Sequence, residues 1–185
     1  GFIIAILTIS DIWKPNKKKE ANAIYGTNDE NHPGVYQIIH NIEDYYLNSI
    51  WKNNEIKEDD YKKLHSFFWL FTLDLKSSKK ITQSIILNWI ENNENFNQKN
   101  WEIDILAKRV IAWISSSKLT YEDGGLVYRN KFNNIIKKQI NHLINEIEKD
   151  QWVDDKMIGC AAIILVGLAY QDKDNYLSFG LNLLR

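Results

Sequence analysis

The chain has 185 residues, 44% of them hydrophobic, and a formal net charge of −1. This composition excludes an intrinsically disordered chain and supplies enough apolar residues for one core of ordinary size with a short flanking segment. Acidic and basic residues are mixed along the sequence, so the charge pattern indicates no nucleic-acid partner. The single cysteine, Cys160, lies in an apolar run, which excludes a disulfide framework within the chain and predicts a buried, inert thiol.

Residues 1–58 are predicted to form an irregular lead-in, because both prolines, Pro15 and Pro33, lie there among polar stretches. Within it, residues 2–9 are compatible with a short strand, although a short apolar run does not distinguish a strand from a helix, and residues 35–51 carry apolar residues at helical spacing. Residues 2–9 are too short to span a bilayer and lack the features of a secretory signal. We therefore expect a cut N-terminus and no membrane span, and the compartment is not readable from the sequence.

Residues 59–185 carry apolar residues at the spacing of amphipathic helices. The fifth of these helices is apolar on nearly all sides, which predicts an inner helix surrounded by others. The sixth ends without a cap, so we expect the natural chain to continue beyond Arg185. The sequence predicts an all-α fold of helical hairpins, either a fragment of an α/α toroid or a non-repeating bundle. The expected helices span about 59–75, 78–92, 101–114, 127–149, 154–170 and 175–185.

Six segments, several of which contain tryptophan, carry a family resemblance: Leu64–Leu70, Trp89–Ile90, Trp101–Asp104, Lys108–Ile114, Gly167–Tyr170 and Gly180–Leu184. In order and spacing they resemble the N-terminal helical region of heparinase II/III-like proteins. The resemblance covers residues 60–185, and residues 11–26 are weakly similar to a stretch that precedes this region in bacterial members. It implies an incomplete α/α toroid followed by a β-sandwich domain, which would lie beyond Arg185.

The resemblance also implies an activity. Such proteins are polysaccharide lyases, carbon-oxygen lyases that degrade uronic-acid polymers by β-elimination, and the partner would be an acidic polysaccharide. No cofactor is implied, and the resemblance allows a periplasmic or cell-envelope location. The main catalytic groups would lie beyond Arg185, so the 185 residues alone are expected to be inactive.

Two acidic residues stand where the family has a substrate-neutralising Asn-His pair. Asp154 and Asp155 match that position, at the start of the expected inner helix. Carboxylates there would repel a substrate carboxylate instead of neutralising it. The alternative is that Asp154 caps the helix.

Two pairs at i, i+4 spacing are the candidate substrate-binding residues: His65 with Trp69, and Arg109 with Trp113. Aromatic faces stack on sugar rings, imidazole titrates near neutral pH, and a guanidinium binds carboxylate or sulfate. The alternative is that all four belong to the core. A second alternative for Arg109 is a structural bridge to Asp104 or Glu102.

The sequence leaves other functions open. A second hypothesis is a non-catalytic helical scaffold or glycan-binding module, and a third is a toroid glycoside hydrolase that uses Asp104 and Asp74 as its carboxylate pair. The remaining histidines show no metal-ligand spacing, so no metal site is expected.

Overall fold

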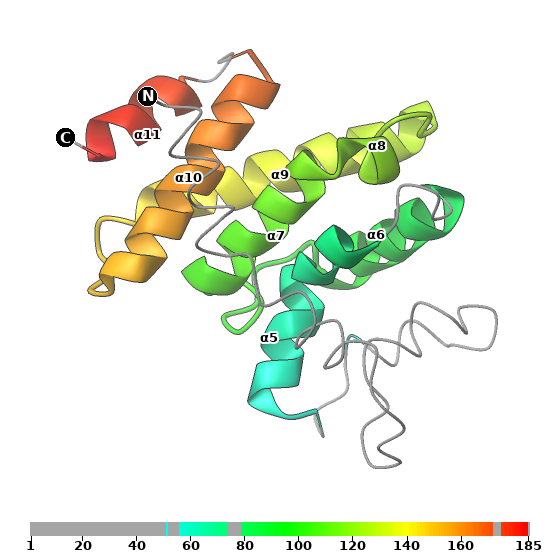
Figure 1. Cartoon of the computed structure of the whole chain (residues 1–185), viewed down its shortest axis with the longest axis horizontal. Helices are drawn as coiled ribbons and strands as arrows, with labels where there is room; N and C mark the ends of the chain where they lie inside the picture. The colour runs from blue at the N-terminus through cyan, green and yellow to red at the C-terminus, as the bar shows by residue number, and fades with distance from the viewer. Residues whose placement is uncertain (1–50, 52–55, 74–78, 172–174, 185) are drawn as a thin grey trace. The chain divides into compact units, whose positions relative to one another are not determined.

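The computed structural model describes residues 51, 56–73, 79–171 and 175–184 (Figure 1). The chain divides into two compact units, residues 1–45 and 46–185, and all described residues belong to the second. The strand predicted at residues 2–9, most of the helix predicted at 35–51, and Asp74 lie outside the described residues. The predicted boundary between residues 58 and 59 stays a prediction.

The described residues form seven α-helices and one 3-10 helix and contain no strand, which confirms the all-α class for this part of the chain. The toroid arrangement stays a prediction. No described helix has both the length and the apolar character needed to cross a membrane. The elements are α5 (Glu58–Ser66), η2 (Phe68–Thr72), α6 (Lys79–Asn93), α7 (Ile103–Ser115), α8 (Ser117–Thr120), α9 (Leu126–Glu146), α10 (Val153–Ala169) and α11 (Tyr176–Leu183).

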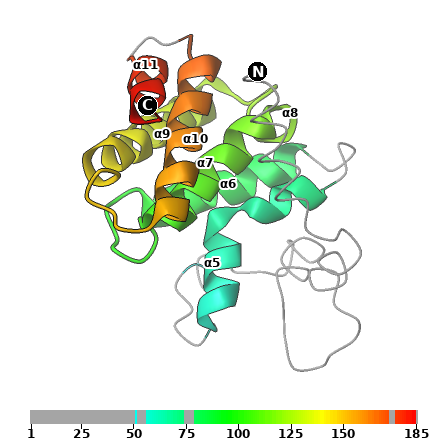
Figure 2. The same ribbon diagram turned by 60° about the vertical axis from the view of Figure 1, so that its left-hand side comes forward.

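Helix α7 is the centre of this unit. It packs against α5, η2, α9 and α10, and Figures 1 and 2 show it between α10 and α6. Its apolar side chains recur every three or four residues, and Ile105, Leu106, Val110 and Trp113 are fully buried. Burial of such side chains supplies most of the stability of a helical core. A residue on the inner face of α7 is therefore held by contacts from several helices at once.

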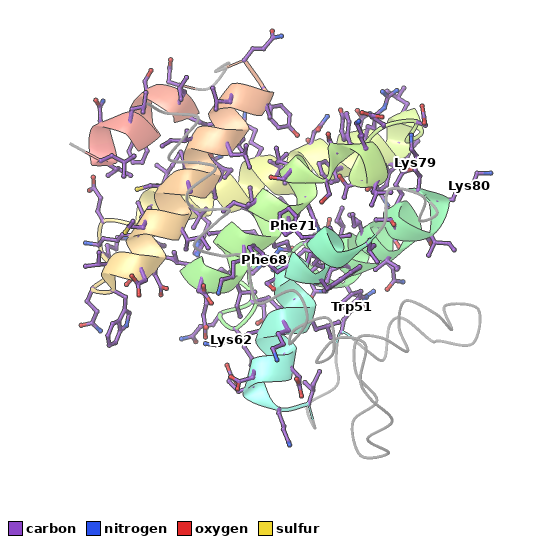
Figure 3. All side chains as sticks on the ribbon, viewed as in Figure 1. Trp51, Lys62, Phe68, Phe71, Lys79 and Lys80 are labelled. Atoms are coloured by element: carbon purple, nitrogen blue, oxygen red, sulfur yellow. The ribbon has the colours of Figure 1, made fainter. Side chains whose placement is uncertain are left out.

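The helix predicted over residues 59–75 is wrong in one respect: it is broken at Phe67, between α5 and η2. Phe67 has a left-handed backbone, with φ of 55°. Its buried ring stacks on Trp51 at a centroid distance of 5.8 Å and meets the edges of Trp89 and Trp113 at 6.0 and 5.1 Å. Figure 3 labels Trp51, which comes from before α5. The aromatic contacts offset the cost of the unusual backbone.

Helices α10 and α11 lie side by side in both ribbon views (Figures 1 and 2). A side chain at Gly167 would place its Cβ 2.4 Å from the backbone nitrogen of Leu177, so only glycine permits this approach. The middle of α10 is buried, as predicted for an inner helix, but Met157 is 54% exposed and Leu168 49% exposed. In the described unit, α10 is therefore enclosed along its middle and open at both ends.

Candidate functional site

Arg109 occupies the centre of a cluster of polar and aromatic side chains inside the unit. Its guanidinium is fully buried on α7. Nη1 donates to the carbonyl oxygen of His65 at 2.9 Å, Nη2 to that of Asn100 at 3.0 Å, and Nε to Oε1 of Gln139 at 3.0 Å. The guanidinium carbon lies 4.2 Å from the ring centre of Trp89, in cation–π geometry. One side chain thus joins α5, α6, α9 and the loop before α7.

Further hydrogen bonds extend the cluster. The Trp89 indole donates to Nδ1 of His65 at 3.1 Å. The Tyr61 hydroxyl donates to Oδ1 of Asn100, and Nδ2 of Asn100 donates to Oδ1 of Asn93 at 2.6 Å. Two buried atoms of the cluster, Nε2 of His65 and Nε2 of Gln139, have no hydrogen-bond partner among the described residues. The network therefore uses most, but not all, of its polar atoms.

Burial dominates the electrostatics of this cluster. It lowers the pKa of Arg109 to about 9, so the guanidinium is still charged at neutral pH. Burial, with the positive charges of Arg109 and Lys99, lowers the pKa of His65 to about 3, so the imidazole is neutral. Burial also raises the pKa of Tyr61 to about 12. Arg109 is the buried cation of the cluster, and the acceptors of its hydrogen bonds are neutral oxygen atoms.

The structure brings the four predicted substrate-binding residues into one interior region. His65 accepts from Trp89, Arg109 donates to His65, and Trp113 lies 5.5 Å from Trp89, edge to face. His65, Arg109 and Trp113 have no exposed surface, and Trp69 is 4% exposed. A substrate-binding role for these residues stays a prediction, and a ligand would reach the first three only if the core opened. The contacts that the structure shows for them are those of a core.

The alternative for Arg109, a structural bridge to Asp104 or Glu102, does not occur in the described part of the chain. Asp104 pairs with Lys108 at 2.6 Å, and Glu102 pairs with Lys62 at 3.5 Å. Sequence reasoning missed Gln139 and the two carbonyl groups as the partners of Arg109. Backbone carbonyls carry no sequence signal, and Gln139 lies 30 residues away on α9.

Asp154 and Asp155 lie in the first turn of α10, at the helix start where the sequence placed them. The N-cap is Trp152, not Asp154, and no side chain caps the helix. Burial and the negative charges of Asp104 and Asp150 raise the pKa of Asp155. Acidic residues in a first helical turn interact favourably with the helix dipole. A role for Asp154 or Asp155 at the position of the family Asn-His pair stays a prediction.

A pocket of about 510 Å³ opens where α7, α8, α9 and the end of α10 meet. Nδ2 of Asn133 donates to the Tyr121 hydroxyl oxygen at 3.1 Å, and the Tyr170 hydroxyl donates to Oδ1 of Asn133 at 2.7 Å. Burial raises the pKa of Tyr170. In the described residues no three His, Cys, Asp or Glu side chains gather to hold a metal. The pocket is lined by Trp113, Ile114, Ser117, Tyr121, Phe132, Ala169, Tyr170 and Gln171.

Comparison with known proteins gives matches of a different kind from the sequence resemblance. Residues 1–49 match the PUA-like domain family. A sulfate adenylyltransferase of Phaeosphaeria nodorum is 48% identical over 44 residues, which are 24% of this chain and 8% of that protein. One of Neosartorya fischeri is 37% identical over 62 residues, 33% of this chain and 11% of that protein. A probable bifunctional SAT/APS kinase of Sorangium cellulosum is 46% identical over 39 residues, 21% of this chain and 7% of that protein. No solved structure matches.

These matches correct the family and the function expected from the sequence. The chain is similar to sulfate adenylyltransferases, and the heparinase II/III-like assignment was wrong. These relatives are named as transferases that act on sulfate, whereas the sequence analysis expected a carbon-oxygen lyase that degrades polysaccharide, so that expectation is corrected. The acidic polysaccharide partner and the β-sandwich domain were implied by the heparinase-like resemblance, so they are not supported. The same matches contradict the two other predicted functions, a glycan-binding module and a toroid glycoside hydrolase. The chain spans no more than 11% of the length of these relatives.

Proposed function

We propose that the natural protein containing these 185 residues takes part in sulfate activation, as a transferase that moves an adenylyl group from a nucleotide to sulfate. The observation that carries the proposal is the 48% identity over 44 residues with the sulfate adenylyltransferase of Phaeosphaeria nodorum. The PUA-like match to residues 1–49 supports the same assignment. Both observations concern a short part of the chain, and the activity belongs to the whole protein.

In this proposal the helical unit contributes packing instead of chemistry. Its support is the interior of the unit, where Arg109 and His65 are fully buried and bonded to neighbouring helices. A side chain that acts in adenylyl transfer must contact the substrate. Arg109 and His65 are fully buried, so they do not meet this requirement.

The proposal is tested with the purified natural protein, ATP and Mg²⁺, by following pyrophosphate release with and without sulfate. Transfer of the adenylyl group from ATP to sulfate releases one pyrophosphate, so release that depends on added sulfate is the expected result. Release that is absent, or the same without sulfate, would contradict the proposal.

An Arg109→Met variant tests the supporting role of the helical unit. It should unfold at a lower temperature than the parent protein. At a temperature where both are folded, its sulfate-dependent rate should be unchanged, since Arg109 is fully buried. A folded variant with a strongly reduced rate would place Arg109 closer to the chemistry than the proposal allows. A Lys138→Met variant serves as control, because Lys138 is exposed on α9.

A further inference from the structure

Helix α10 keeps apolar side chains that the described helices around it do not cover. Helices α7, α9 and α11 pack against it. From Met157 to Ala169 the helix carries no charged residue, and a helix that is apolar on nearly all sides is normally enclosed by others. Val153, Met157 and Leu168 are nevertheless 68%, 54% and 49% exposed. The described unit therefore encloses one side of α10 and leaves apolar surface open on another.

The uncovered side chains fall on one face of the helix. Val153, Met157, Ala161 and Leu165 follow one another at intervals of four residues, and Leu168 comes three residues later. Residues at these intervals lie above one another on a helix surface. Ala161 and Leu165 are half-buried, between the exposed residues at the two ends. We call these five residues the α10 stripe. It is about 22 Å long, which matches about four turns of a second helix packed along it.

Charge lies at only one end of the α10 stripe. Asp154 is exposed and Asp155 is half-buried in the first turn of α10. Lys108 is already paired with Asp104 at 2.6 Å, and Lys156 offsets only one of the two carboxylates in the first turn. Burial and then the negative charge of Asp104 raise the pKa of Asp155. A cation brought to this end by a partner would reduce the repulsion between the carboxylates.

We propose that the α10 stripe binds an amphipathic helix of another protein, whose apolar face covers the stripe and whose last turn places Lys or Arg beside Asp154 and Asp155. A helix fits because side chains spaced four residues apart form a ridge that packs into the groove of a second helix. Antiparallel packing places the last turn of the partner at the start of α10, and cations are favourable in a last turn.

The charges also argue against two other occupants. Parallel pairing with a second copy of the chain would bring like carboxylates together, and antiparallel pairing would place Asp154 against the apolar Leu168. An anionic membrane surface would be repelled by the same carboxylates. The proposed interaction does not depend on sulfate activation, because it uses only residues of α10.

The test measures binding of two labelled synthetic peptides to the 185-residue chain by fluorescence anisotropy. Each peptide forms about five turns of helix with Leu along one face, and one carries Lys in its last turn where the other carries Glu. Met157→Gln and Leu168→Gln each place a polar side chain on the α10 stripe, and the second serves if the first fails to fold. Leu126→Gln is the matched control, because Leu126 is 70% exposed on α9, outside the stripe. Asp154→Lys tests the charge.

The expected result is that the Lys peptide binds the parent chain and Leu126→Gln equally and binds each folded stripe variant at least about tenfold more weakly. The Glu peptide should bind the parent chain at least about tenfold more weakly than the Lys peptide does, and Asp154→Lys should remove that difference.

Four results would overturn the proposal. The Lys peptide does not bind the parent chain, the two peptides bind it equally, the folded stripe variants keep the parent affinity, or Leu126→Gln loses as much affinity as they do. Sedimentation of the parent chain adds a fifth, because a dimer that Met157→Gln converts to a monomer would show that a second copy occupies the stripe.

Discussion

Acid should destabilise the helical unit through His65. The imidazole is fully buried on α5, stacks on Tyr61 at 4.2 Å and accepts a hydrogen bond from Trp89 at its Nδ1. A second proton would remove that acceptor and place a charge close to Arg109. Burial and the nearby cations Arg109 and Lys99 therefore lower the pKa of His65 to about 3, from an ordinary 6.5.

The sign and size follow from linkage. Between the two pKa values, His65 binds a proton in the unfolded chain but not in the folded chain. The contribution of neutral His65 to the free energy of unfolding is therefore fully present above pH 6.5 and falls as the pH drops toward 3. At about pH 4.5, two units below the unfolded pKa, His65 should cost about 3 kcal/mol of unfolding free energy relative to neutral pH.

Urea unfolding at about pH 7 and about pH 4.5 measures this contribution when the parent chain is compared with His65→Asn. Asparagine keeps an acceptor oxygen for Trp89 and does not titrate in this range. The variant is expected to be less stable at both pH values but to lose about 3 kcal/mol less than the parent on acidification. His142→Gln is the control, since burial also lowers the pKa of that half-buried histidine. Equal acid losses in the parent and His65→Asn would refute the reasoning.

Three substitutions test the packing. Arg109→Met leaves three acceptor oxygens without their donor and should cost about 3–5 kcal/mol in denaturant unfolding, and a cost under about 1 kcal/mol would contradict the network. Gly167→Ala should lower the midpoint of thermal unfolding because its Cβ would meet Leu177, whereas Gly125→Ala, with nothing within 4 Å, should lower it far less. Tyr128→Phe removes the hydroxyl that donates to a buried carbonyl at 2.5 Å and should cost about 1 kcal/mol, so unchanged stability would show that this bond contributes nothing.

The periodicity of apolar residues predicted most of the described helices, because each buries one face against its neighbours. Helices α6, α7, α9 and α10 begin and end within a few residues of their expected bounds. The break at Phe67 was not predictable in this way. Apolar residues continue through it at helical spacing, and the left-handed backbone is held by rings that come from before α5, from α6 and from α7.

The burial of the candidate site residues could not be predicted from the sequence pattern. His65, Trp69, Arg109 and Trp113 were recognised as two helix-face pairs, but spacing alone does not show whether a face meets solvent or the core. For Arg109 the deciding partners are carbonyl groups of residues 65 and 100, which only the tertiary structure brings together.

The family was missed because the resemblance rested on buried tryptophans and aliphatic residues, which many helical cores share. Those positions report packing, and packing does not specify an activity. The informative match lies in residues 1–49, which were predicted to be an irregular lead-in.

The measurement that tests the central claim most directly is the conversion of labelled sulfate to adenylyl sulfate by the natural protein in the presence of ATP. The proposed function predicts a labelled nucleotide product that requires both ATP and the protein. A folded protein that leaves all the label as free sulfate would contradict it.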